Sequence, residues 1–113
     1  MKVLCIDKVK PDMNSRSDIA ELLKREAQVA WQHYSDGVIR EMYFRAPPEQ
    51  GAILVLECSG LDEAKELLMQ LPLTKAGVIE WEVIGLAPFT LLNTLFAETK
   101  AAQTETAFTD VEK

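Results

Sequence analysis

The side chain best placed to do chemistry is Glu26, because its carboxylate lies within an apolar stripe of helical spacing. The apolar members of this stripe recur at intervals of three and four residues: Ile19, Leu22, Leu23, Ala27, Ala30 and Tyr34. We therefore expect Glu26 to face the core. An ionised carboxylate in apolar surroundings is costly unless it is paired, hydrogen-bonded or at a cavity wall. Glu26 is accordingly either an acid/base group in a cavity or a shoulder residue paired with a lysine or arginine.

His33 is a weaker catalytic candidate on the same segment. It lies seven residues after Glu26 and so two turns along, on nearly the same face. Its ring could enter the same cleft and exchange protons near neutral pH. The alternative is a surface histidine that interacts with the dipole at the helix C-terminus. The hydroxyl of Tyr34 is a further possible donor, with packing as its alternative role.

Arg40 is the candidate for binding an anionic group of a substrate. Residues 38–45 predict a strand, in which Arg40 shares one face with Val38, Met42 and Phe44. A guanidinium on that face could bind a carboxylate, although an ordinary ion pair is the alternative. Tyr43, on the opposite face, is a weaker substrate-binding candidate.

The two cysteines, Cys5 and Cys58, offer no metal or redox chemistry. Both lie in strand-like segments, and neither belongs to a C-x-x-C motif or a cluster with histidine. We expect reduced thiols and no metal site.

The predicted elements follow one another as strand, helix, strand, strand, helix, strand. Their ranges are 2–10, 17–35, 38–45, 52–58, 59–71 and 78–84, with a turn-rich connection at 46–51 and a loop at 73–77. The strand 52–58 is almost wholly apolar and should be central and buried on both faces. This order predicts an α+β, ferredoxin-like βαββαβ fold, with a four-stranded antiparallel sheet and two helices on one face.

Local signals predict where the two helices begin and end. Ser15 or Ser17 can cap the first helix, and Gly37 can end it with a positive φ. Ser59 can cap the second helix, with Asp62 in the position of a capping box, and Pro72 should stop it.

One face of such a sheet stays uncovered in a single chain, which predicts self-association. Two sheets can pack face to face in a homodimer. We expect a domain over residues 1–97 that ends in an apolar arm, 86–97, which packs on a neighbouring subunit or lids its own cleft. Residues 98–113 should be a disordered tail.

Length and charge exclude several classes of protein. The 113 residues suffice for one domain, and the formal net charge of -6 argues against binding nucleic acid or an anionic membrane. No signal-peptide core or membrane-spanning segment is evident, so we expect a cytoplasmic protein.

The run Leu68-Met69-Gln70-Leu71-Pro72-Leu73, followed by Glu82-Val83 and Gly85-Leu86, resembles the muconolactone isomerase family. The resemblance extends weakly over residues 1–88. It implies a small dimeric α+β barrel that assembles into rings and has a cofactor-free site that moves a proton between carbons of an unsaturated lactone. A glutamate on the first helix is one of the family's acid/base groups, and Glu26 matches it.

This sequence departs from the family at two places. Glu49-Gln50 replaces a histidine and tyrosine before the third strand, and Thr74-Lys75 replaces an aromatic-proline pair. The first functional hypothesis is therefore a cofactor-independent isomerase or lyase acting on a small unsaturated lactone or carboxylate. The alternatives are a non-catalytic module that binds small ligands or assembles, and a cofactor-free monooxygenase of an aromatic substrate.

Overall fold

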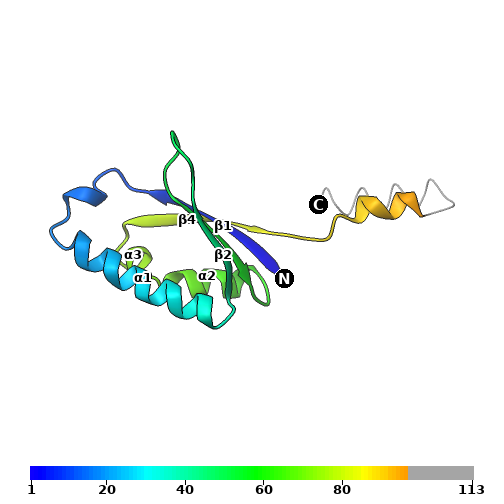
Figure 1. The fold of residues 1–113 in the computed structure, drawn as a ribbon, viewed down its shortest axis with the longest axis horizontal. Helices are drawn as coiled ribbons and strands as arrows, with labels where there is room; N and C mark the ends of the chain where they lie inside the picture. The colour runs from blue at the N-terminus through cyan, green and yellow to red at the C-terminus, as the bar shows by residue number, and fades with distance from the viewer. Residues whose placement is uncertain (97–113) are drawn as a thin grey trace.

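Four antiparallel strands form a sheet with the spatial order β2-β3-β1-β4 (Figure 1). The strands are β1 (Lys2–Val9), β2 (Ile39–Phe44), β3 (Ala52–Glu57) and β4 (Ile79–Gly85). This computed structural model describes residues 1–96. The strand order and the antiparallel pairing confirm the predicted ferredoxin-like α+β fold, with β3 in the centre of the sheet.

The helices α1 (Ile19–Ser35) and α2 (Leu61–Met69) lie on the same side of the sheet, as predicted (Figure 1). A short helix, α3 (Pro72–Lys75), occupies the segment predicted as a loop. Helix α2 ends at Met69, before the predicted stop at Pro72. Pro72 begins α3, since proline has no N–H to lose at a first helical position. A 3₁₀ turn, η1 (Met13–Ser15), leads from β1 to α1.

The core lies between the sheet and the helices. Val3 and Cys5 of β1 and Leu54 and Leu56 of β3 face the helices and are buried. The side chains that point to the other face of these strands are only half-buried, because nothing in the described chain covers that face: Leu4, Ile6, Ile53 and Val55. The prediction that β3 is buried on both faces therefore holds on the helix side alone.

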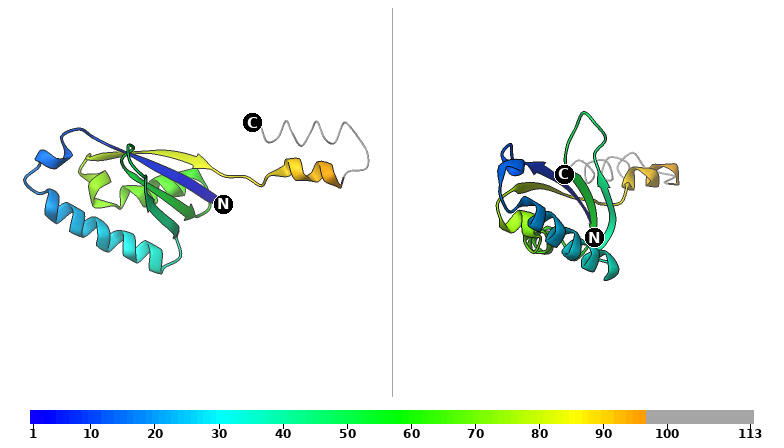
Figure 2. Two further views of the ribbon diagram at one scale, coloured as in Figure 1. Left: turned by 45° about the horizontal axis from the view of Figure 1, so that its top comes forward. Right: turned by 60° about the vertical axis from the view of Figure 1, so that its left-hand side comes forward.

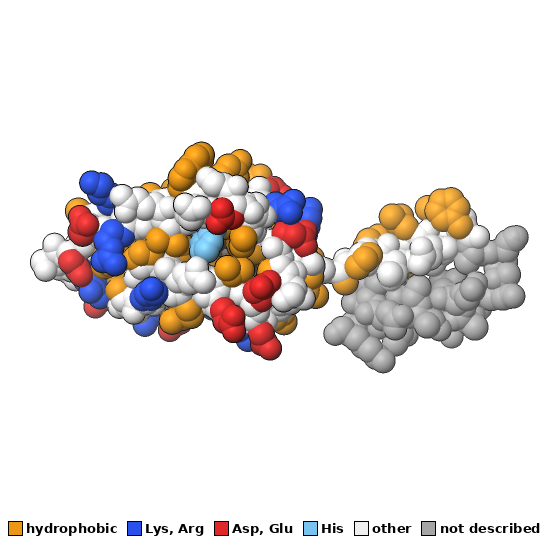
Figure 3. Space-filling view, turned by 90° about the horizontal axis from the view of Figure 1, so that it is seen from below, with side chains coloured by type: hydrophobic (Ala, Val, Ile, Leu, Met, Phe, Trp, Pro, Cys, Tyr) orange, Lys and Arg blue, Asp and Glu red, His pale blue; other side chains and the backbone are white. Residues whose placement is uncertain are grey.

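Helix α1 has two apolar stripes, where the sequence predicted one. Leu22 is buried, and Glu26, Val29 and His33 also turn inward. A second stripe on the outside, which we call the outer stripe, consists of Leu23, Ala27, Trp31 and Tyr34. The prediction that Leu23, Ala27 and Tyr34 face the core is wrong, because spacings of three and four fit two adjacent faces of a helix. Figure 3 shows apolar side chains exposed between charged ones on this helical side.

Both helix N-termini differ from the prediction. The N-cap of α1 is Asp18, whose side chain accepts no hydrogen bond from the helix backbone, and that of α2 is Gly60, which has no side chain. The Asp18 side chain instead accepts hydrogen bonds from Arg16 at 2.9 and 3.1 Å. At α2, Glu63 takes the role predicted for Asp62, since its Oε1 accepts the Ser59 N–H at 2.7 Å. The end of α1 is confirmed, because Gly37 adopts a φ of +81°.

A β-bulge lies between Ile39 and Glu41 of β2. Ile39 pairs with Leu56 and Met42 with Leu54, so both face the helices. A regular strand would place these two side chains on opposite faces, and that is what the sequence predicted. The extra residue of the bulge restores both to the helix side.

The apolar arm leaves the sheet after β4 and runs away from the sheet and helices in every view (Figures 1 and 2). It ends in η2 (Thr90–Leu95), and its large side chains are exposed: Leu86, Phe89, Leu92, Leu95 and Phe96. The arm does not cover its own chain, and its packing on a neighbouring subunit stays a prediction. The predicted tail, 98–113, lies outside the described residues, as does Ala97.

Within residues 1–96 no helix is both long enough and apolar enough to cross a membrane.

Candidate functional site

Glu26 lies in the middle of α1, is half-buried and reaches α3 with its carboxylate. Its Oε1 accepts a hydrogen bond of 2.9 Å from the backbone N–H of Leu73, at the start of α3. No lysine or arginine of residues 1–96 forms an ion pair with it. Burial raises the pKa of Glu26, the Leu73 N–H lowers it, and the negative charge of Asp7 raises it further. The core-facing position is thus confirmed, without the ion pair that the alternative required.

Asp7 is a second carboxylate on the sheet side of this space. It follows Val3 and Cys5 on the helix-facing side of β1 and is 6% exposed. Its Oδ1 accepts the Ala52 N–H at 2.8 Å, at the first residue of β3. Burial raises the pKa of Asp7, whereas this hydrogen bond and the charge of Arg45 lower it.

Arg45, just after β2, is the cation next to Asp7. Its Nη2 donates to the backbone oxygens of Asp7, at 3.4 Å, and of Gln50, and its Nη1 lies 3.8 Å from a carboxylate oxygen of Glu49. Its Nε is buried and has no hydrogen-bond partner. Glu49 and Gln50 therefore hold an arginine beside the site.

Gly51 allows the connection between β2 and β3 to approach Asp7 closely. It has a φ of +105°, and a Cβ there would lie 2.1 Å from Oδ1 of Asp7. Only glycine adopts this conformation at little cost and leaves room for the carboxylate.

Trp81 and Thr74 close the site on the β4 side. Trp81 pairs with Asp7 in the register of β1 and β4, and its Nε1 donates a 2.9 Å hydrogen bond to Oγ1 of Thr74. Thr74 thereby fixes the orientation of the indole ring.

His33 lies at a cavity that Glu26 does not line. It lines a small apolar cavity between α1, α2 and the sheet with Val38, Ile39, Leu54, Leu56, Leu67, Leu68 and Leu71, and Glu26 is not among the lining residues. Seven helical residues correspond to about 10 Å along the axis. Nε2 of His33 is buried without a hydrogen-bond partner. The catalytic role of His33 stays a prediction, at a place separate from the two carboxylates.

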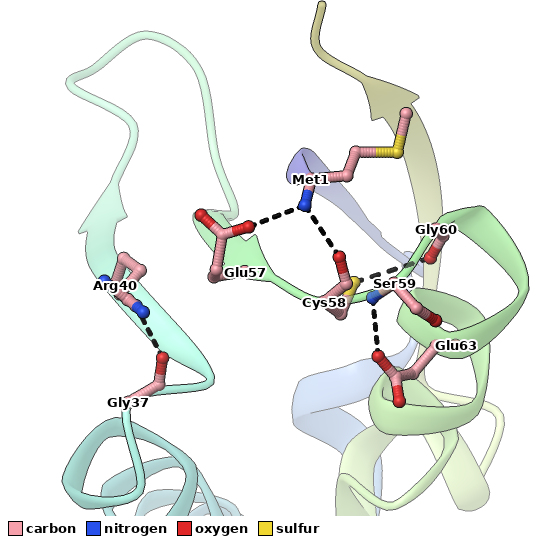
Figure 4. A network of polar contacts seen from close by, with 8 residues as sticks. All are labelled: Met1, Gly37, Arg40, Glu57, Cys58, Ser59, Gly60 and Glu63. Carbon is pink, nitrogen blue, oxygen red and sulfur yellow. Dashed lines mark hydrogen bonds and ion pairs between the residues drawn. The ribbon is translucent and has the colours of Figure 1, made fainter.

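The structure places Arg40 and Tyr43 away from Glu26 within one chain. Nε of Arg40 donates to the Gly37 oxygen at 2.6 Å. Arg40 lies on the side of Glu57, the last residue of β3, whereas Ala52 is the first residue of that strand (Figure 4). Tyr43 is exposed, and its hydroxyl donates to Oε1 of Glu41 at 2.8 Å, a bond that raises the pKa of Tyr43. Their substrate-binding roles stay predictions.

Sequence reasoning missed Asp7 and Arg45. The signal for Asp7 was its position two residues after Cys5 on an alternating strand, which places it on the buried face. Arg45 had no comparable signal, because its contact with Asp7 depends on the path of the connection after β2.

Both cysteines are free thiols, and no group of three or more His, Cys, Asp or Glu in residues 1–96 is arranged to hold a metal. Cys5 is fully buried, and burial, together with the charge of Cys58, raises the pKa of its thiol to about 11. A thiol in this state is a poor nucleophile at neutral pH.

The raised pKa of Glu26 predicts how stability depends on pH. Because its pKa is higher in the folded state, protonated Glu26 favours folding below the unfolded pKa of about 4.3, and this contribution is lost as pH rises through the folded-state pKa. We therefore expect the free energy of unfolding of Glu26→Gln, minus that of the wild type, to increase from pH 4 to 7, because only the wild type loses stability as Glu26 ionises. Urea unfolding at several pH values measures it.

The exposed Glu66 on α2 provides a matched control as Glu66→Gln. A difference for Glu26→Gln that is flat with pH, or falls, would contradict a desolvated Glu26.

Two solved structures are similar to this chain. A crystal structure of muconolactone isomerase aligns with a TM-score of 0.63 and 23% sequence identity, over 78% of this chain and 90% of that one. A 5-chloro-2-hydroxyhydroquinone dehydrochlorinase from Burkholderia phenoliruptrix AC1100, in complex with 2,5-dihydroxybenzoquinone, aligns with a TM-score of 0.52 and 20% identity, over 77% and 94%. No protein-family model matches the chain, and a comparison with curated protein sequences gave no match.

At these identities the likeness concerns the fold. It agrees with the resemblance carried by residues 68–73 and with the observed strand order. The chain therefore has the α+β fold of muconolactone isomerase.

Proposed function

We propose that this protein is a cofactor-independent isomerase that moves a proton on a small unsaturated lactone or carboxylate, with Glu26 as its acid/base group. The observation that carries the proposal is a half-buried carboxylate whose hydrogen-bond partner is a backbone amide, Leu73 N–H, and whose ionisation is opposed by burial. A carboxylate with a raised pKa is a stronger base near neutral pH. The likeness in fold to muconolactone isomerase supports the same reaction class.

The proposed reaction conserves all atoms and electrons. The carboxylate of Glu26 accepts a proton from a carbon beside the carbonyl, and the electron pair of the broken C–H bond passes to the carbonyl oxygen as an enolate. The protonated carboxyl then returns the proton to another carbon of the conjugated system while the double bond moves. Arg45 is the cation on this side of the site, and a predicted role for Arg40 requires it to approach from a second copy.

Self-association is part of the proposal. The uncovered face of the sheet presents a patch of aliphatic side chains, Leu4, Ile6, Ile53, Val55 and Ile84, and charged residues flank it. A second copy packed on this face removes the patch from water. A homodimer or larger ring is therefore proposed, and a cytoplasmic location remains a prediction from the sequence.

A non-catalytic module that assembles or binds small ligands is the second candidate. Its support is the apolar surface outside the site, namely the outer stripe of α1, with Trp31 64% exposed, and the arm, with Phe96 84% exposed. Such surfaces usually mark contacts with a partner.

Proton exchange on substrate carbon distinguishes the two candidates. Wild-type protein is incubated in D₂O with a panel of unsaturated five-membered lactones and enolisable carboxylates, and NMR follows deuterium incorporation and movement of the double bond. The isomerase proposal expects both to be accelerated over buffer for at least one compound. Association in solution and lactone binding without any exchange would instead favour the non-catalytic module.

A further inference from the structure

Asp7 is the one charged residue that is buried in the part of the chain that the structure describes. It lies on the same face of β1 as Val3 and Cys5, two side chains with no exposed surface. A carboxylate is costly at such a position. If its role were only to accept the Ala52 N–H, an uncharged asparagine could accept the same hydrogen bond at a lower cost of burial.

The surroundings hold the Asp7 carboxylate in one place. The Ala52 amide binds Oδ1, Gly51 has no Cβ and so lets the connection pass close to this oxygen, and Arg45 donates to the Asp7 backbone oxygen. The charge of Arg45 lowers the pKa of Asp7, but Arg45 forms no ion pair with this carboxylate. The negative charge is thus fixed in position and only partly compensated.

A chain of contacts joins Asp7 to Glu26: Trp81 pairs with Asp7 across β1 and β4, its Nε1 donates to Thr74, and Thr74 follows Leu73, whose N–H binds Glu26. The negative charge of Asp7 also opposes the ionisation of Glu26. Glu26 itself has no cation in ion-pair contact among residues 1–96 and receives one backbone N–H, from Leu73. Trp81, which pairs with Asp7 across β1 and β4, is uncharged. A fixed negative charge in such a site favours the protonated form of a neighbouring carboxyl.

We propose that Asp7 is a positioning residue for Glu26: its buried charge strengthens Glu26 as a proton acceptor and stabilises the protonated Glu26 that exists between the two proton transfers. The inference rests on the proposed function for its role in turnover. The coupling of the two carboxyls is a property of the resting protein and is measured without a substrate.

The test compares the carboxyl titration of Glu26 by ¹³C NMR in the wild type and in Asp7→Asn, a variant that retains an acceptor for the Ala52 N–H. We expect the Glu26 midpoint to move to lower pH in Asp7→Asn and to stay in place in the control Asp12→Asn, whose aspartate is exposed. An unchanged Glu26 midpoint in folded Asp7→Asn overturns the inference.

If Asp7→Asn does not fold, the reciprocal measurement decides. Linkage requires that Glu26→Gln shift the Asp7 midpoint to lower pH by the same coupling. An Asp7 titration that is identical in wild type and Glu26→Gln overturns the inference.

Where the wild type turns over a lactone, the pH profile of kcat/KM adds a readout that loss of structure would not produce. The rate should rise with pH as Glu26 ionises, and in Asp7→Asn this rise should move to lower pH while the plateau falls. A lower plateau without movement of the rise shows a merely structural Asp7 and overturns the inference. Coupled titrations in a protein that exchanges no substrate proton contradict the proposed function and leave the coupling itself established.

Discussion

Glu26→Gln is expected to lower kcat for lactone isomerisation by about 10²–10⁴-fold, the usual contribution of a positioned acid/base group. The amide keeps an oxygen that can accept the Leu73 N–H, so the attachment between α1 and α3 is retained. What the variant loses is a group that can take and return a proton. Steady-state kinetics, with KM and kcat determined separately, measures this effect, which should lie mainly in kcat.

Two controls make the Glu26→Gln result specific. Glu66→Gln, on the exposed side of α2, should keep wild-type kinetics. His33→Gln tests the separate cavity beside α2, and a loss there without a loss in Glu26→Gln would move the site to His33. Wild-type turnover in folded Glu26→Gln would remove the proposed mechanism.

Leu56→Ala is expected to lower the free energy of unfolding by about 2–5 kcal/mol, as for other leucines truncated in a core. Leu56 is 1% exposed and lies in the middle of the sheet, opposite Val3 of β1 and Ile39 of β2. It already borders the apolar cavity next to His33, so truncation enlarges an existing void. Urea unfolding at a fixed protein concentration measures the loss, since association would otherwise contribute to it.

Leu61→Ala is the matched control, because the same atoms are removed from a side chain that is 41% exposed. Its loss should be well below that of Leu56→Ala. Equal losses at the two positions would contradict the described core.

The fold was predictable because its signals are local and repeated. Alternation along 78–84, the apolar run 52–56 and the positive φ of Gly37 each gave a correct element or boundary. The helix caps were not predictable, because several polar residues stand near each helix start. Which residue becomes the N-cap, here Asp18 and Gly60, depends on where the chain enters the helix.

The site was predictable only in part. A carboxylate at helical spacing within a stripe identified Glu26, since that pattern belongs to one segment. Asp7, Arg45 and the Leu73 N–H come from three other segments, and only the assembled layers bring them near Glu26. The prediction of Arg40 rested on a regular β2, whereas the bulge changes the faces of that strand.

The bulge in β2 also affects how this chain is compared with proteins of the same fold. A relative with a regular strand here would have one residue fewer between the counterparts of Ile39 and Met42. An alignment without a gap at this point would match inward residues to outward ones on one side of the bulge. Homologous positions in this strand should therefore be assigned from superposed backbones, with a one-residue insertion at Arg40, before any residue of β2 is used to infer specificity.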